Sequence, residues 1–216
     1  MKGKDTMNYN MECEKILNSI DLAHKPSLLL HACCAPCSSS VLEKIAQYFT
    51  ITILFYNPNI TDYQEYLKRR EELEKFISLV GYEIKLLDCN YDKEKFLAMS
   101  KGMEDLKEGD IRCYQCYQLR LEETAKMAKA YHFDYFGTTL SISPYKNSQW
   151  LNEIGKTLAE QYHINYLYAD FKKKNGYQRS IELSHAYHLY RQDYCGCIYS
   201  KVERMKSRRL QDQKLV

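Results

Sequence analysis

The sequence predicts an α/β protein built on a parallel β-sheet with helices on both faces. Short apolar runs rich in β-branched and aromatic residues alternate with longer amphipathic segments along most of the 216 residues. A parallel sheet needs such an alternation, because neighbouring parallel strands are usually joined by a helix. The first apolar run also leads directly into a tight turn and a helix, as strands of open α/β sheets do.

The N-terminal part of the chain contains the first repeat of this pattern. Residues 8–22 are expected to form a short helix with one apolar face, which ends before Pro26. The apolar run 27–32 is the first predicted strand. A helix is predicted over 38–48, and we expect the run of serines at its start to supply the cap.

The second and third strands follow the same rule. Residues 51–56 are β-branched, apolar and aromatic and are predicted to be a strand. The long charged segment 62–80 is amphipathic and is predicted to be a helix that ends at Gly81. A third strand is expected at 83–88, and a short helix at 93–100.

The C-terminal half begins with a polar, glycine-flanked loop at 102–111. Apolar periodicity beyond this loop predicts helices at 112–131, 149–163, 178–189 and 200–211. Strands are predicted between them at 134–140 and 165–169. The polar segments that follow these two strands are expected to be a binding loop, 141–147, and a basic loop, 170–177.

The chain contains no internal repeat, low-complexity tract or recognisable linker, so a single domain is expected over 1–216. Within it, the α/β core is expected to span 27–200. A helical extension, 1–26, precedes the core, and a charged tail, 201–216, follows it.

Composition restricts the class of protein. A content of 45% hydrophobic and 27% charged residues is ordinary for a globular protein, and a net charge of +3 permits a nucleic-acid partner without requiring one. No run approaches the roughly 18 apolar residues that a membrane span needs. The basic N-terminus is not followed by the apolar segment of a secretory signal. We therefore expect a cytoplasmic protein that does not enter membranes.

The nine cysteines are the most informative residues. A reducing compartment is expected for this chain, and clustered cysteines there bind metals or carry out redox chemistry. Cys13 and Cys89 stand alone and are expected to be small packed side chains. The other seven form three clusters: Cys33, Cys34 and Cys37; Cys113 and Cys116; and Cys195 and Cys197.

The first two clusters predict a metal centre. Cys33, Cys34 and Cys37 follow the first strand, and Cys113 and Cys116 lie at the start of a predicted helix, where the dipole favours thiolates. Four thiolates from two elements satisfy a [4Fe–4S] cluster. Zinc is the chemical alternative, although structural zinc needs four ligands and seven cysteines are available.

The third cluster, Cys195-Gly196-Cys197, leaves two interpretations open. A disulfide between such close neighbours closes a very small, strained ring that is easily reduced, which suits a redox pair. Gly196 would supply the backbone freedom that this ring needs. Alternatively, both thiolates bind a metal.

Several motifs, in one order, make the chain similar to the cobalamin-independent epoxyqueuosine reductases of the QueH type. The similarity covers residues 27–200. It is carried by His31-Ala32-Cys33-Cys34-Ala35-Pro36-Cys37-Ser38, Arg112-Cys113 to Cys116 with Leu119-Arg120-Leu121, Thr138-Thr139-Leu140 with Ser143-Pro144-Tyr145-Lys146, Asp170-Phe171-Lys172-Lys173 with Gly176-Tyr177, and Tyr190-Arg191-Gln192-Asp193-Tyr194-Cys195-Gly196-Cys197.

This resemblance implies a Rossmann-like fold related to the adenine-nucleotide α-hydrolases, and the last step of queuosine synthesis. In that step, epoxyqueuosine at the tRNA wobble position loses its epoxide oxygen. The resemblance also implies that a [4Fe–4S] cluster is held by Cys33, Cys34, Cys113 and Cys116. Cys195 and Cys197 would be a redox-active pair or would bind an additional iron, and Cys37 stands between these roles.

Further candidates come from the chemistry of epoxide reduction, which needs electrons, protons and an acid for the leaving oxygen. Asp193 and Asp110 are candidate carboxylate ligands for an additional iron, with an ordinary solvated loop residue as the alternative. Tyr194 and His31 are candidate proton donors. His31 is equally well explained as a core histidine whose hydrogen bonds are satisfied.

The implied partners are tRNA that bears epoxyqueuosine and an unidentified electron-donor protein. Basic residues in predicted loops and helix starts are candidates for phosphate contacts: Lys146, Lys172, Lys173, Lys174, Arg179 and Arg191. Nearby tyrosines are candidates for stacking on anticodon bases: Tyr145, Tyr177 and Tyr190. Each basic residue has the alternative of an ordinary solvated charge.

Two other classes of function remain alternatives. One is a PP-loop-like tRNA-modifying enzyme that transfers sulfur or an adenylyl group, although no Ser-Gly-Gly-x-Asp-Ser-like phosphate loop follows the first strand. The other is a zinc-stabilised RNA-binding module without catalytic activity.

Overall fold

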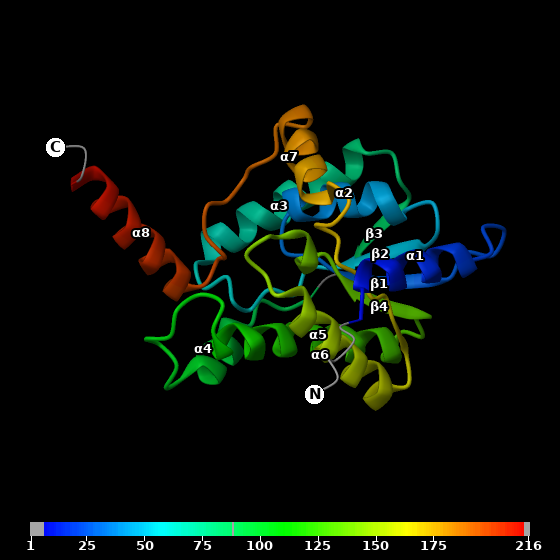
Figure 1. Ribbon diagram of the computed structural model, residues 1–216, viewed down its shortest axis with the longest axis horizontal. Helices are drawn as coiled ribbons and strands as arrows, with labels where there is room; N and C mark the ends of the chain where they lie inside the picture. The colour runs from blue at the N-terminus through cyan, green and yellow to red at the C-terminus, as the bar shows by residue number, and fades with distance from the viewer. Residues whose placement is uncertain (1–6, 88, 214–216) are drawn as a thin grey trace, which may run out of the picture.

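A computed structural model describes residues 7–87 and 89–213. It contains a parallel sheet of five strands in the order β3-β2-β1-β4-β5 (Figure 1). The strands are β1 (Ser27–His31), β2 (Thr50–Leu54), β3 (Ile84–Leu87), β4 (Tyr135–Thr138) and β5 (Asn165–Tyr166). The expected parallel sheet is therefore confirmed. Residues 1–6 of the expected extension, residue 88 of the third strand and residues 214–216 of the tail lie outside the described residues.

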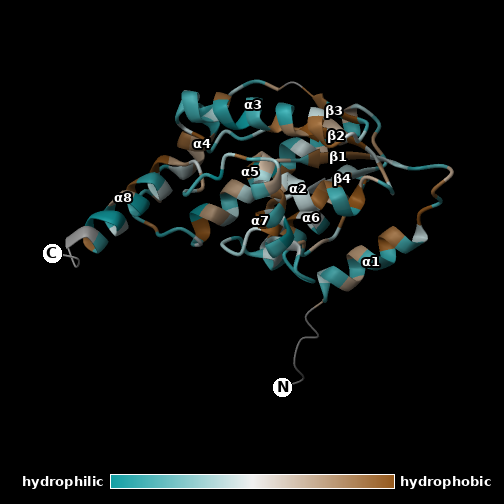
Figure 2. Cartoon of the chain, turned by 90° about the horizontal axis from the view of Figure 1, so that it is seen from above, coloured by the Kyte–Doolittle hydropathy of each residue, from teal (hydrophilic) through white to brown (hydrophobic). Residues whose placement is uncertain are grey.

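Helices cover both faces of the sheet, as the sequence predicts. Leu28 and Leu30 of β1 belong to a core shared with α1 (Tyr9–Ser19), α2 (Ala35–Ile45) and α3 (Tyr63–Leu79). Leu29 points to the opposite face, where α5 (Ile111–Ala130) and α6 (Ser148–Tyr162) pack. Figure 1 shows α2 and α3 above the sheet and α5 and α6 below it, and Figure 2 shows hydrophobic colouring around the strands.

Three further helices complete the fold. The short α4 (Lys93–Ser100) shares a small apolar cluster with α5. The helix α7 (Gly176–Ala186) lies against α2, where the Ser40 hydroxyl donates a hydrogen bond to the Gly176 carbonyl. The last helix, α8 (Ile198–Gln213), extends away from the body of the molecule (Figure 1). Among the described residues, no helix is long and apolar enough to span a membrane.

The start of α2 differs from the sequence prediction. The helix begins at Ala35 and not at Ser38, and Cys34 is its N-cap: the Cys34 sulfur accepts the Cys37 backbone N–H at 3.4 Å. Pro36 fits this first turn because its missing N–H would have no helical partner there. The Ser38 hydroxyl lies inside the helix and donates to the Cys34 carbonyl. The expected serine cap is therefore wrong, and a thiol takes its place.

Candidate metal centre

The cysteine turn follows β1, the central strand of the sheet, so its thiols lie at the carboxyl edge where open α/β sheets place their sites. The Cys33, Cys34 and Cys37 sulfurs lie within 4.8 Å of one another, and the Cys33 and Cys34 sulfurs are 3.7 Å apart. Among the described residues, these three cysteines form the group of potential metal ligands whose ligand atoms lie this close together. Cys37, which the sequence leaves between roles, is thus part of the tightest group.

The thiols of the turn have opposite protonation preferences. Burial raises the pKa of Cys34, but hydrogen bonds from Cys33 and Cys37 and the charge of Arg69 outweigh it, and the pKa lies well below its ordinary value. The pKa of Cys37 lies well above its ordinary value, because the Cys33 and Cys34 sulfurs accept from the Cys37 thiol. The Cys34 thiolate is therefore stabilised before any metal is bound.

The second cluster enters from the first turns of α5. Cys113 packs in the same apolar cluster as Cys33 and Cys34, and its sulfur accepts the Gly109 backbone N–H at 3.2 Å. Cys116 packs with Cys197 instead. Burial raises the pKa of Cys116 to about 12, and the Cys195 thiolate contributes to this increase. Cys113 and Cys116 lie outside the 4.8 Å group, next to the third cluster.

The third cluster is held in place by a buried arginine of α3. Arg69 is 1% exposed, and its guanidinium donates to the carbonyls of Cys195, at 3.1 Å, and Tyr194, at 3.3 Å. Gly196 has a φ of +118°, and a Cβ there would lie 2.9 Å from Ile60. A side chain at this position would therefore be strained, and the close approach of Ile60 requires glycine here. Cys195 and Cys197 are both free thiols.

A second buried arginine lies among the three clusters. Arg120 of α5 is 1% exposed, and its Nε donates to the Cys116 carbonyl at 3.3 Å. Its Nη2 has no hydrogen-bond partner, and none of the ion pairs among the described residues includes it. Burial lowers the pKa of Arg120, but interactions with Cys116, Cys195 and Cys33 outweigh this effect, so that the pKa lies above its ordinary value.

The charge of Arg120 and the sulfur donors around it can be compared with the requirements of an iron–sulfur centre. A buried cation without a carboxylate partner is costly unless another negative charge compensates for it. Cysteine sulfurs, which become thiolates when they bind a metal, are the groups that can compensate for the charge of Arg120. An all-sulfur donor set suits iron–sulfur clusters and zinc, and the compensating cations suit a thiolate-rich centre. The residues therefore fit the group.

The first and third clusters contribute Cys33, Cys37 and Cys195 to the lining of one pocket of about 450 Å³, a size typical of ligand sites. It brings together nine of the residues predicted for the site: Cys33, Cys37, Tyr145, Lys146, Tyr177, Arg191, Asp193, Tyr194 and Cys195. Tyr145 is 77% exposed at the entrance, which leaves its ring free to stack on a base. Arg191 donates to the Ser184 hydroxyl at 2.8 Å.

Lys146 has a different environment from the one expected of a phosphate-binding lysine. Its Nζ donates to the Cys195 sulfur at 3.2 Å, and it lies 5.8 Å from the centre of the Tyr117 ring. Burial lowers the pKa of Lys146, but the Cys195 thiolate outweighs that effect, and the pKa lies well above its ordinary value. The structure therefore places this cation on a cysteine of the site.

His31 lies at the end of β1 and is completely buried. Its Nδ1 is 3.0 Å from the Thr138 hydroxyl, and its Nε2 is 3.0 Å from the Tyr56 carbonyl. Burial and the charge of Arg120 lower the pKa of His31 to about 3. The structure thus favours the second interpretation of His31, a neutral core histidine with both ring nitrogens occupied.

The other candidate catalytic groups have local partners. Asp193 lies at the pocket wall and forms ion pairs with Arg204, at 3.5 Å, and Arg208 of α8. Asp110 is the N-cap of α5 and accepts the Ile111 N–H at 2.7 Å. Burial raises the pKa of Tyr194 to about 12, so its hydroxyl keeps its proton at neutral pH.

Most of the predicted basic residues outside the pocket are engaged in ion pairs. Lys172 pairs with Asp170 at 2.8 Å, and Lys174 lies 3.7 Å from Glu14. Arg179 binds Glu43 with two hydrogen bonds. Lys173 is exposed. Tyr190 donates to Glu65, and the Lys68 Nζ lies 3.4 Å from the centre of its ring. The structure does not bring these residues into the pocket.

The sequence analysis assigned no role to the buried arginines. Arg120 lies four residues after Cys116 and seven after Cys113, so the three share a helix face. This spacing was a signal that a cation lies beside the thiols. Arg69 had no such signal, because the segment around it is simply charged and amphipathic.

A family model described as "Epoxyqueuosine reductase QueH" matches residues 28–203. The chain belongs to the QueH family. The match includes all three cysteine clusters and all the residues that line the pocket except Arg204 and Ser207 of α8.

Curated relatives named epoxyqueuosine reductase QueH agree with this assignment. The relative from Staphylococcus epidermidis is 40% identical over 204 residues, which cover 91% of this chain and 86% of the relative. The Histophilus somni relative is 43% identical over 80% of this chain and 71% of its own length. The Thermotoga maritima relative is 36% identical, with 82% and 92% covered.

Proposed function

We propose that this protein reduces the epoxide of epoxyqueuosine at the wobble position of tRNA and so completes queuosine synthesis. The observation that carries this proposal is the meeting of Cys33, Cys37 and Cys195 at one pocket in a QueH family member. The family assignment supports a reductase over a sulfur or adenylyl transferase and over an RNA-binding zinc module.

We further propose that Cys33, Cys34, Cys113 and Cys116 hold a [4Fe–4S] cluster, with Cys37 placed between the role of a cluster ligand and the role of Cys195 and Cys197. The cluster, when bound, would supply electrons for the reduction. Cys195 and Cys197 act as a redox-active pair or bind an additional iron. The proximity of Cys116 to Cys197 in one apolar cluster supports a joint role for the second and third clusters.

The chain's own residues supply binding and protons. Tyr145 and Tyr177 line the pocket and stack on the anticodon bases. Lys146 holds Cys195 in position by a hydrogen bond from its ammonium group. Tyr194 is a proton donor for the leaving epoxide oxygen, because it lines the pocket.

The proposed substrate determines where in the cell the reaction takes place. A tRNA substrate places the protein in the cytoplasm, and we propose that residues 1–216 act there as a single domain. Arg191 contacts phosphate from the pocket wall, and Lys173 does so from the exposed loop before α7. Asp193 is held by Arg204 and Arg208, so it serves as a metal ligand only after those ion pairs open.

The decisive experiment is anaerobic purification followed by iron, zinc and sulfide analysis and by an assay with epoxyqueuosine-containing tRNA and dithionite. We expect about four irons and four sulfides per chain, a broad visible band that dithionite bleaches, and conversion to queuosine. Iron in excess of sulfide would indicate the additional iron. A colourless zinc protein that converts no substrate after cluster reconstitution would contradict the proposal.

A further inference from the structure

The helix α8 has two faces with different surroundings. Side chains at positions 200, 203, 204 and 207, which share one face, line the pocket beside the cysteines. The opposite face carries Ile198, Val202 and Met205, which are 42%, 40% and 49% exposed. Their spacing of four and three residues places them in one stripe along the helix. We call these three residues and Arg209, one turn further on, the outer stripe.

The outer stripe has the character of a protein-docking surface. Three large apolar side chains in a row are more than a solvated helix face needs, and an amphipathic helix commonly docks through anchors at this spacing. Basic residues border and extend the stripe: Lys206 on one side, Arg209 at its end, and on the other side Lys201, which pairs with Asp62 at 3.1 Å. Among the ion pairs of the described residues, none includes Lys206 or Arg209. Residues 198–213 contain five Lys or Arg and two Asp or Glu.

The outer stripe begins next to the third cysteine cluster, where electrons would have to arrive. Ile198, its first residue, directly follows Cys197 of the third cluster. Cys197 is 7% exposed, and its sulfur accepts the backbone N–H of Ser200 in the first turn of α8 at 3.4 Å. A protein that covers the outer stripe therefore contacts Ile198, the residue next to Cys197 in the sequence. The pocket, where the substrate base enters, remains open on the other face of the helix.

We propose that the outer stripe of α8 docks an acidic electron-carrier protein. This inference rests on the proposed function. Conversion of the epoxide to an alkene breaks two C–O bonds, forms the C=C π bond and releases the oxygen as water. The reaction consumes two electrons and two protons. Two one-electron carriers, each oxidised once, supply the electrons.

The apolar stripe favours a protein over tRNA as the occupant. Phosphate contacts require cations but gain nothing from exposed Ile, Val and Met side chains. The pocket face of α8 already carries Arg204, and Arg208 reaches Asp193 from the same side of the helix. We therefore assign the pocket face to the RNA and the outer stripe to the carrier. The carrier is expected to be acidic because of the basic border.

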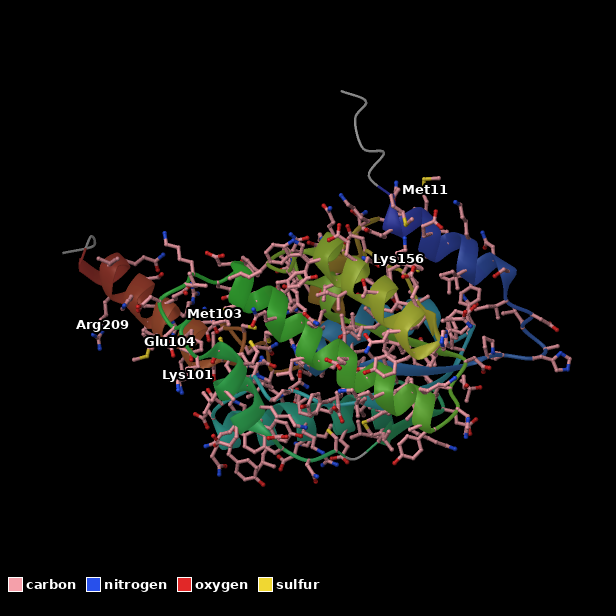
Figure 3. All side chains as sticks on the ribbon, turned by 90° about the horizontal axis from the view of Figure 1, so that it is seen from below. Met11, Lys101, Met103, Glu104, Lys156 and Arg209 are labelled. Atoms are coloured by element: carbon pink, nitrogen blue, oxygen red, sulfur yellow. The ribbon has the colours of Figure 1, made fainter. Side chains whose placement is uncertain are left out.

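The test compares substitutions on α8 with matched substitutions elsewhere in the full-length, metal-loaded protein. Met205→Glu and Arg209→Glu alter the outer stripe. Met11→Glu on α1 makes the same substitution, and Lys156→Glu on α6 makes an equal charge reversal, at exposed positions away from α8; Figure 3 labels Met11, Lys156 and Arg209 on their three helices. A reduced plant-type [2Fe–2S] ferredoxin and a reduced flavodoxin serve as acidic probes, and dithionite serves as a reductant that needs no docking.

The measured quantities are the rate of bleaching of the visible band and the dissociation constant of each carrier. At low salt, we expect the two α8 variants to be reduced at least tenfold more slowly by the carriers and to bind them at least tenfold more weakly. Their reduction by dithionite is expected to be unchanged. The Met11→Glu and Lys156→Glu proteins are expected to match the wild type with all reductants.

Four outcomes would overturn the inference: equal rates for all variants, no reduction of the wild type by either carrier, loss of tRNA affinity in the α8 variants, or a wild-type dimer that Met205→Glu dissociates. The last two would identify the stripe as an RNA surface or as a self-association surface. The proposed function is tested separately, because the wild type with dithionite and epoxyqueuosine-containing tRNA needs no carrier.

Discussion

Cys13 and Cys34 are two thiols with the same exposure and opposite chemistry. Each is 1% exposed. Cys13 lies on α1 among the aliphatic side chains of one sheet face, and burial raises its pKa to about 11. Cys34 lies at the start of α2, and hydrogen bonds from two neighbouring thiols, together with Arg69, hold its pKa well below the ordinary value in spite of burial.

The difference shows that the immediate donors decide whether a buried cysteine is inert. Desolvation acts on both thiols and favours the neutral form. At Cys34, the Cys37 backbone N–H also points at the sulfur from the first turn of a helix, where the dipole favours negative charge. No comparable donor compensates for the burial of Cys13, whose stabilising charges are the amines of Lys44 and Lys174.

The largest expected effect comes from removing Cys34, the thiol that accepts several hydrogen bonds. Cys34→Ala should reduce metal content to less than half of the wild-type value and epoxyqueuosine reduction at least about 100-fold, because the turn loses the sulfur whose thiolate form its neighbours favour. Metal analysis and a tRNA assay test this. Cys13→Ala is the matched control and should retain full metal content. Equal metal content in both variants would remove the distinction between the two thiols.

Removing the cation beside Cys34 should mainly affect stability. Arg69→Met leaves Glu65, whose side chain is 12% exposed, without its partner and frees the loop that carries Cys195. We expect a loss of about 3–5 kcal/mol in the free energy of unfolding, as for other broken buried ion pairs. Lys126→Met on α5 removes an exposed pair with Glu122 and should cost about 0.5 kcal/mol. Urea denaturation of the metal-free variants measures both; similar losses would contradict the role of Arg69.

The inert thiol should show an effect of packing alone. Cys13→Ala deletes one buried sulfur from the apolar core and should lower the free energy of unfolding by about 1 kcal/mol at pH 7. The visible spectrum and the reduction rate of the metal-loaded protein should remain those of the wild type. A changed spectrum would show that α1 supports the metal centre.

The smallest expected effect is a pH dependence that Cys13 alone contributes. Its folded pKa is about 11, above the ordinary value of 9.0, so the folded state binds this proton more tightly. The resulting stability is complete below pH 9 and is lost as pH rises towards 11. Between pH 8 and pH 10, the wild type should lose about 1 kcal/mol more than Cys13→Ala. Parallel pH profiles for the two proteins would contradict the assigned pKa.

The fold was largely predictable because its determinants are local. Each strand is a short apolar run, and each helix has an apolar face, so the alternation was readable along the chain. The start of α2 was not predicted, because serines are the commoner caps and nothing in the sequence shows that the Cys34 sulfur takes that position. The strand at 165–169 was also overestimated, since only Asn165–Tyr166 pair with β4.

The site was predictable in its residue types and less so in its contacts. Cysteine spacing indicated three clusters, but only the structure shows which of them approach one another. Lys146 and Arg179 both resembled phosphate-binding residues. Their side chains instead contact Cys195 and Glu43, partners that are 49 and 136 residues away in sequence. Contacts between such distant residues depend on the packing of whole helices, which no local pattern records.

The thiol cap of α2 links the backbone of a core helix to the chemical state of a single sulfur atom. Oxidation of Cys34 to a sulfinic or sulfonic acid would replace a compact acceptor by a bulky charged group at the first turn of α2. That turn leads into Ser40, which hydrogen-bonds to Gly176 next to the pocket residue Tyr177. Oxidation in air would therefore change the shape of the substrate pocket as well as the metal site. Faster amide hydrogen exchange at the start of α2 would reveal this change before the protein unfolds.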